Sequence, residues 1–145
     1  MSIIVVWVLL AISLYFKPLK PSSIIIGIVT TAYTLVYDIT LGHHFGLYYY
    51  IDPQGSVSYI ALAGVFLYSV LNILYTLFLP EKRSGALIYT GIWIIAMLAF
   101  EYASILIKTI VFTGWQPIPW SFVTYIVTYT LVYYFYRYLQ ERLCQ

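Results

Sequence analysis

Five long apolar stretches, separated by short polar segments, make up most of the chain. They cover residues 2–19, 24–41, 57–79, 85–107 and 120–138. The fourth has 23 residues, and as a helix it would be about 34 Å long, slightly more than the roughly 30 Å hydrocarbon core of a bilayer. The pattern predicts an all-α integral membrane bundle of five transmembrane helices, formed as a single domain by residues 1–145.

The first stretch is the shortest, because its apolar run from Ser2 to Phe16 stops before Pro18. It crosses a bilayer if it continues through Leu19 or if the bilayer thins locally. No basic residue precedes it and no small-residue cleavage site follows, so we interpret it as a retained anchor and not a signal peptide. The following KPLKPSS predicts a tight loop, with Ser22 or Ser23 capping the second helix.

Two of the connections are long and aromatic. HHFGLYYYIDPQGS, after Gly42, predicts a folded connection at the membrane surface, where tyrosine can keep its ring in lipid and its hydroxyl in water. TIVFTGWQPIP contains a glycine and two prolines, and Trp115 and Trp120 are expected at the same kind of interface.

The basic residues are distributed unequally between the two sides of such a bundle. One side would hold Lys17, Lys20, Lys82, Arg83, Arg137 and Arg142, and the other Lys108 alone. Because basic residues favour the cytoplasmic side, we expect the N-terminus outside, the C-terminus in the cytoplasm and both long connections outside.

Composition agrees with a membrane protein and excludes several classes of function. Of the 145 residues, 63% are hydrophobic and only 8% are charged, which is typical of a chain whose partner is the lipid bilayer. The few scattered basic residues do not form a nucleic-acid surface. Cys144 is the only cysteine, which excludes an internal disulfide and a cysteine-based metal cluster. We find no phosphate-binding loop, nucleophile elbow or H-E-x-x-H motif, and predict no cofactor and no metal.

Two acidic residues inside apolar stretches are the main candidates for function. Asp38 lies 15 residues after Ser23, and Glu101 lies 16 residues after Gly85. If these stretches are parallel helices, both carboxyl groups reach about the same depth, in the outer half of the membrane. Ionisable groups at that depth usually face a bundle interior or a wet cavity. They either line an external cavity that binds a cation, proton or polar ligand, or they hold helices together through hydrogen bonds.

Other polar residues are expected at the same outer end. His43 and His44 are adjacent and would point about 100° apart on a helix, which does not suit one metal ion but allows one of them to partner Asp38. Lys108 lies two turns beyond Glu101, about 10.5 Å along the axis, and is expected to reach outward. The candidate ligand-binding set is Glu101, Asp38, His43, His44, Tyr102 and Lys108; no residue is assigned a catalytic role.

Two further features concern packing. Asn72 would lie in the inner half of the third span, away from the acids, and make an interhelical hydrogen bond. Ala96, Ala99 and Ala103 form a smooth strip on the fourth span, which favours close packing inside the bundle or, alternatively, a seam between two copies.

Two stretches carry a family resemblance. YDITLGHHFGLYYYIDP, residues 37–53, and FEY at residues 100–102, followed by Gly114-Trp115, resemble small multi-pass membrane proteins of spore-forming Gram-positive bacteria that are mostly uncharacterised. The resemblance implies a five-span protein of a bacterial plasma membrane and again directs attention to Asp38 and Glu101. It implies no established activity.

A second similarity is to the membrane carotenoid cyclases, which also have an aromatic-Asp pair followed by glycine, aromatic residues and a proline. Their next span carries paired acids, whereas residues 59–69 here contain none. The catalytic group that such a cyclase would need is therefore missing from this stretch.

These observations lead to one leading hypothesis and two alternatives. The leading hypothesis is a non-enzymatic membrane protein whose outward-facing polar pocket binds a small or lipid-like ligand, or which binds a membrane partner or a second copy. The first alternative is a small proton-coupled transporter or channel, in which the acids change protonation. The second is an intramembrane enzyme acting on an apolar substrate.

Overall fold

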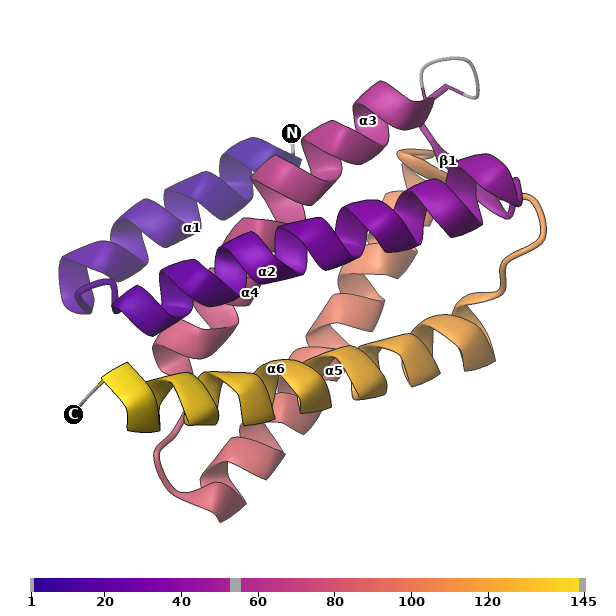
Figure 1. Ribbon diagram of the computed structural model, residues 1–145. Helices are drawn as coiled ribbons and strands as arrows, with labels where there is room; N and C mark the ends of the chain where they lie inside the picture. The colour runs from indigo at the N-terminus through magenta and orange to yellow at the C-terminus, as the bar shows by residue number, and fades with distance from the viewer. Residues whose placement is uncertain (1, 53–55, 144–145) are drawn as a thin grey trace.

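The computed structural model describes residues 2–52 and 56–143, and this part of the chain is mostly helical (Figure 1). The α-helices are α1 (Ser2–Phe16), α2 (Pro21–Asp38), α3 (Ser56–Ala63), α4 (Ser69–Phe78), α5 (Arg83–Leu106) and α6 (Phe122–Leu143). Wider π-helical turns continue several of them: η1 (Ile39–His44), η2 (Gly64–Tyr68) and η3 (Pro117–Ser121). The strands are β1 (Tyr48–Tyr50) and β2 (Ile110–Phe112).

Three helical stretches are long and apolar enough to cross a membrane. They are Pro21–His44, Val57–Phe78 and Arg83–Leu106, which correspond to the second, third and fourth apolar stretches of the sequence. Helix α1 is shorter, with 15 residues, and α6 has 22 residues but a more polar composition. The helical class and a membrane-type composition are thus confirmed.

Helix α2 is the centre of the bundle and packs against both α4 and α6, whereas α1 packs against α4, and α5 against α6 (Figure 1). The core between them is apolar and aromatic. Its most buried members include Val6, Ile26, Val70, Tyr75, Met97, Tyr129 and Val132. Many large apolar side chains on the outward faces remain exposed, as a surface in contact with lipid requires.

The start of α2 differs from the prediction. Pro21 occupies its first turn, where the missing N–H of proline leaves no donor unsatisfied, and Lys20 is the extended N-cap residue. Ser22 and Ser23 therefore lie inside the helix, where both are buried, and neither caps it.

The two long connections pair with each other, which the sequence did not predict. Strands β1 and β2 form a two-stranded antiparallel sheet in which Tyr48 faces Phe112 and Tyr50 faces Ile110. The connection after Gly42 is folded, as expected, up to the last residue described before the gap at 53–55. We refer to this end of the bundle as the sheet end.

The opposite end holds two basic residues against the C-terminal end of α4, and we call it the basic end. Lys17 Nζ donates to the carbonyl oxygen of Leu77, 3.4 Å away, and lies 5.0 Å from the ring centre of Phe78. A guanidinium nitrogen of Arg137 donates to the carbonyl oxygens of Pro80 (2.6 Å) and Glu81 (2.5 Å). These carbonyls follow the end of a helix, where main-chain acceptors are left over.

The alanine strip of α5 does not pack inside the bundle. Ala96, Ala99 and Ala103 are all exposed, on the face of the helix that also exposes Ile92 and Tyr102. The expectation of close packing within the bundle was wrong, because the buried face of α5 is formed by other residues, Ile94, Met97, Glu101 and Ser104.

Candidate functional site

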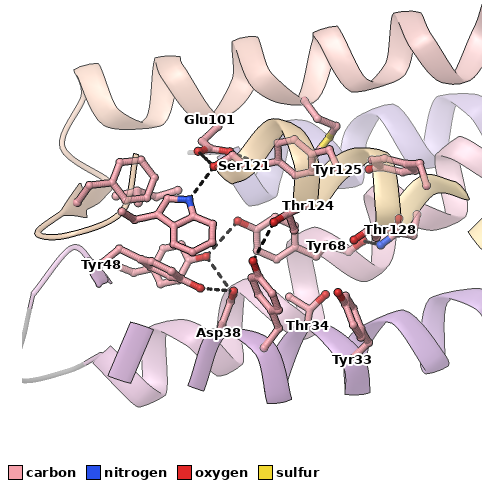
Figure 2. Close-up of a pocket in the computed structure, with 18 residues that line it drawn as sticks. Tyr33, Thr34, Asp38, Tyr48, Tyr68, Glu101, Ser121, Thr124, Tyr125 and Thr128 are labelled. Atoms are coloured by element: carbon pink, nitrogen blue, oxygen red, sulfur yellow. Dashed lines mark hydrogen bonds between the residues drawn. The ribbon is translucent and has the colours of Figure 1, made fainter. Parts of the chain in front are cut away.

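A cavity of about 100 Å³ lies near the sheet end, enclosed by α2, α4, α5, α6 and the small sheet. Figure 2 shows Asp38 reaching into it from α2 and Glu101 from α5, on opposite sides. Each carboxyl group is buried, with 6% of the residue exposed. The structure places both acids on one cavity, whereas their common depth in the outer half of a membrane stays a prediction.

Asp38 is the last residue of α2, and the tyrosine run of β1 holds its carboxyl group. Successive side chains of a strand point to opposite faces, so Tyr48 and Tyr50 point the same way and Tyr49 points away. The hydroxyl of Tyr48 donates to Oδ1 of Asp38 at 2.7 Å, and that of Tyr50 donates to Oδ2 at 3.0 Å. Each oxygen of the carboxyl group thus accepts one hydrogen bond.

The hydroxyl of Tyr50 connects this group to η2. It lies 3.1 Å from the hydroxyl of Tyr68. Since the only hydroxyl proton of Tyr50 is directed to Asp38, Tyr68 is the donor in this contact. A chain of hydrogen bonds therefore runs from Tyr68 through Tyr50 to Asp38.

Glu101 has an equivalent pair of donors at the start of α6. Ser121 Oγ donates to Oε1 at 2.6 Å, and the Tyr125 hydroxyl donates to Oε2 at 2.5 Å. Ser121 and Tyr125 are four residues apart, which places them on one face of a helix. Ser121 in turn accepts a hydrogen bond from the indole N–H of Trp115 at 2.9 Å.

The small sheet and its flanking turn position Trp115. The main-chain N–H groups of Thr113, Gly114 and Trp115 all donate to the carbonyl oxygen of Leu47, at 3.0, 3.0 and 3.1 Å. These three hydrogen bonds attach the connection that precedes α6 to Leu47, the residue before β1. The Trp115 ring packs edge-on against Tyr48, with 6.2 Å between the ring centres, and lines the cavity.

The tyrosines of β1 remain hydrogen-bond donors at neutral pH. Burial raises the pKa of the Tyr48 hydroxyl far above its usual value, and the neighbouring Asp38 carboxylate raises it further. Burial also raises the pKa of Tyr50, with additional contributions from Tyr68 and Asp38. Neither phenol loses its proton at a pH where an exposed tyrosine would.

Asn72 lines this cavity, contrary to the prediction. Its side-chain amide donates to the carbonyl oxygen of Tyr68 in the preceding turn, at 2.9 Å, and not to another helix. Its Oδ1 is buried and has no hydrogen-bond partner. The predicted interhelical hydrogen bond is therefore wrong, because the amide donates within its own helical stretch.

Four residues of the predicted set lie outside the cavity. His43 and His44 end η1 with exposed side chains, and the ring of His44 packs on Phe45 at 5.1 Å between centres. Tyr102 is 61% exposed and points about 100° away from Glu101 around α5. The place beside Asp38 that we expected a histidine to take is occupied by Tyr48 and Tyr50, since β1 turns back over the end of α2.

Lys108 has a role in ending α5. It has a left-handed backbone conformation with φ of 57°. Its N–H donates to the carbonyl oxygen of Ile105, and the N–H of Thr109 donates to that of Ser104, both at 2.9 Å. These two bonds form a Schellman motif, in which glycine usually takes the position of Lys108. The side chain is exposed, as expected.

The chemistry of the cavity is that of hydrogen-bond acceptors among aromatic rings. None of its 18 lining residues is basic. Each carboxyl oxygen has a second lone pair to offer, and the unpartnered Oδ1 of Asn72 adds another acceptor. Within residues 2–52 and 56–143, no group of three or more His, Cys, Asp or Glu side chains is arranged to hold a metal ion.

Several of these residues were not predicted, although two short sequence patterns could have indicated them. The Y-Y-Y run, interpreted as a strand, would have placed its outer two hydroxyls on one face. The i, i+4 spacing of Ser121 and Tyr125 would have placed them on one side of a helix. Neither pattern indicates which acid it faces, because that depends on packing.

Comparison with known proteins gives no family for the chain: no family model, curated protein or solved structure matches it.

Proposed function

We propose that this protein is a five-span membrane protein whose buried cavity binds a small ligand at Asp38 and Glu101. In this proposal α1 and α6 cross the bilayer beside the three long apolar stretches. The excess of Lys and Arg at the basic end supports a cytoplasmic position for that end and an extracellular position for the sheet end. The family resemblance extends the proposal to a bacterial plasma membrane.

The observation that carries the ligand-binding function is the meeting of several hydrogen-bond acceptors at one cavity. Two carboxyl groups from different helices and a buried, unpartnered amide oxygen line one cavity that contains no basic side chain. If the acids served only to join helices, close packing would leave no space between them. The cavity has room for a small polar group or several water molecules.

The proposed activity is binding and not catalysis. Each acid already accepts hydrogen bonds from two hydroxyl groups, which fix the orientation of its carboxyl group. Catalysis would also require a general acid or base placed at the reacting bond of a substrate. No nucleophile or electrophilic centre is identified among the lining residues.

Native mass spectrometry of the full chain, extracted gently from its membrane, tests this function. We compare the unmodified protein with Glu101→Gln and Asp38→Asn, which keep the shape of each side chain and remove its charge. Glu81→Gln is the matched control, because Glu81 is exposed at the basic end. We expect a discrete bound molecule in the unmodified protein and in the control, and its loss in both cavity variants while they stay folded.

Two results would contradict the proposal. If all four proteins carry only bulk lipid and the cavity variants merely unfold more easily, the acids are structural. If ion or proton flux into proteoliposomes depends on Glu101 and no molecule is retained, the protein is a transporter or channel.

A further inference from the structure

A second hollow lies beside the cavity, between α2 and α6. This hollow has a volume of about 290 Å³ and shares Tyr33 and Thr128 with the cavity. Figure 2 shows these two side chains at the far edge of the cavity from Asp38, on facing helices. The two spaces are therefore neighbours, with Tyr33 and Thr128 at their common boundary, and we call the second one the α2–α6 groove.

The groove differs from the cavity in chemistry. Apart from the two shared residues and Thr30, its lining is entirely hydrocarbon and aromatic: Ile26, Val29, Leu131, Val132 and Phe135. The Thr30 hydroxyl is already bonded to the carbonyl oxygen of Ile26 at 2.7 Å. From Tyr33 to Ile26 the groove follows α2 for seven residues, about 10 Å along the helix axis.

The groove is also open along one side. Val29 is 45% exposed and Leu131 is 59% exposed, so its lining reaches the surface of the bundle. A hydrocarbon chain lying in the groove would complete that surface, while a polar group attached to it would enter the cavity at Tyr33 and Thr128.

The charge of the side chains that line the cavity determines which polar head group can bind there. Two carboxyl groups and no basic side chain would repel a phosphate or carboxylate head group. A protonated amine brings three N–H donors, which match the free lone pairs of Asp38 and Glu101 and the unpartnered oxygen of Asn72. The tyrosine and tryptophan rings that line the remaining wall also favour a cation over their faces.

We propose that the site binds a single-chain cationic amphiphile, with its ammonium group between Asp38 and Glu101 and its hydrocarbon chain in the α2–α6 groove. This inference rests on the proposed function and names the class of its ligand.

Binding of defined probes to the purified full-length protein tests the inference. The probes are n-decylamine, decanoic acid, decan-1-ol and ethylamine, each titrated and measured by native mass spectrometry. We expect one n-decylamine per chain, at least about tenfold tighter than ethylamine, and no saturable binding of the acid or the alcohol. Glu101→Gln or Asp38→Asn should weaken n-decylamine binding at least about tenfold.

A pair of neighbouring variants tests the groove alone. Val29→Trp fills the groove from its exposed side and should abolish the advantage of n-decylamine over ethylamine. Ile28→Trp is the matched control, because Ile28 is 66% exposed and does not line the groove. It should bind n-decylamine as the unmodified protein does. Thermal unfolding of both variants verifies that they are folded.

The remaining outcomes separate the inference from the proposed function. If ethylamine binds as tightly as n-decylamine and Val29→Trp changes nothing, the cavity binds a ligand but the groove does not. If the molecule that co-purifies and depends on Glu101 is an anion or is neutral, the proposed function stands and the inference is overturned. If no probe and no co-purified molecule depends on either acid, both are wrong.

Discussion

At the basic end of the bundle, Lys17 and Arg137 donate to main-chain carbonyl groups, whereas at the sheet end Asp38 and Glu101 accept from side-chain hydroxyls. The basic end uses main-chain acceptors: Leu77 in the last turn of α4, where helix carbonyls are left over, and Pro80 and Glu81 in the turn that follows. The sheet end requires donors placed by β1, by the start of α6 and by the pairing of two long connections. The sheet end also has a cavity beside its charged groups.

The difference between the two ends indicates which charged residues stabilise the fold and which bind a ligand. A flexible basic side chain can reach helix-end carbonyls with little demand on the rest of the fold. Two acids held by four separate hydroxyl donors beside a cavity need a defined tertiary structure. Substitutions at the two ends should therefore separate loss of stability from loss of ligand.

The largest effect on stability is expected at the basic end. Arg137→Met removes the charged donor to the carbonyls of Pro80 and Glu81 and should lower the free energy of unfolding by about 2–3 kcal/mol. Ligand binding by the folded fraction should not change, because Arg137 is at the opposite end from the cavity. Denaturation in mixed micelles measures the first effect and native mass spectrometry the second. Arg83→Met, at an exposed position, is the control.

A change at Gly42 should affect both stability and binding at the sheet end. An added Cβ there would lie 3.0 Å from the ring of Tyr48 and 3.3 Å from its carbonyl oxygen. Gly42→Ala should push Tyr48 away from Asp38, lower the free energy of unfolding by about 1–3 kcal/mol and weaken ligand binding.

Gly91 offers the matched control for this substitution. A Cβ at Gly91 meets nothing within 4 Å, and the residue lies within α5. Gly91→Ala should raise the free energy of unfolding by up to about 1 kcal/mol and leave binding unchanged. Equal effects at Gly42 and Gly91 in thermal unfolding would mean that the contact with Tyr48 does not matter.

A smaller effect is expected when one donor of Asp38 is removed. Tyr50→Phe takes away a hydroxyl that donates to Asp38 and accepts from Tyr68, and should lower the free energy of unfolding by about 0.5–1.5 kcal/mol. It should weaken ligand binding severalfold, because Asp38 loses its orientation. Tyr49→Phe, on the opposite face of β1, should change neither quantity. Identical ligand titrations for the two variants would contradict the assignment of Tyr50 to the site.

The smallest effect is expected at Lys108. Lys108→Gly relieves a left-handed backbone conformation and should raise the free energy of unfolding by up to about 1 kcal/mol. Lys108→Ala keeps the conformation and removes the charge. Both variants should bind ligand normally, since the side chain is exposed outside the cavity. Loss of binding in both variants would place the charge of Lys108 in the site after all.

The sequence by itself predicted the features that depend on local properties of the chain. Helix formation in the second, third and fourth apolar stretches follows from their length and hydropathy. The common depth of Asp38 and Glu101 follows from counting residues along two parallel helices, since the rise per residue is nearly constant. Both predictions needed no knowledge of what lies beside each helix.

Only the tertiary structure decided what each polar side chain faces. Direction around a helix depends on packing, which put Asn72 in the cavity and the strip of Ala96, Ala99 and Ala103 on the outside. The donors of Asp38 come from a strand that forms only by pairing with residues 110–112, some sixty positions later in the chain. A pairing between segments so far apart has no local signal in the sequence. The sequence therefore predicted a histidine as the partner of Asp38, whereas the structure has Tyr48 and Tyr50 there.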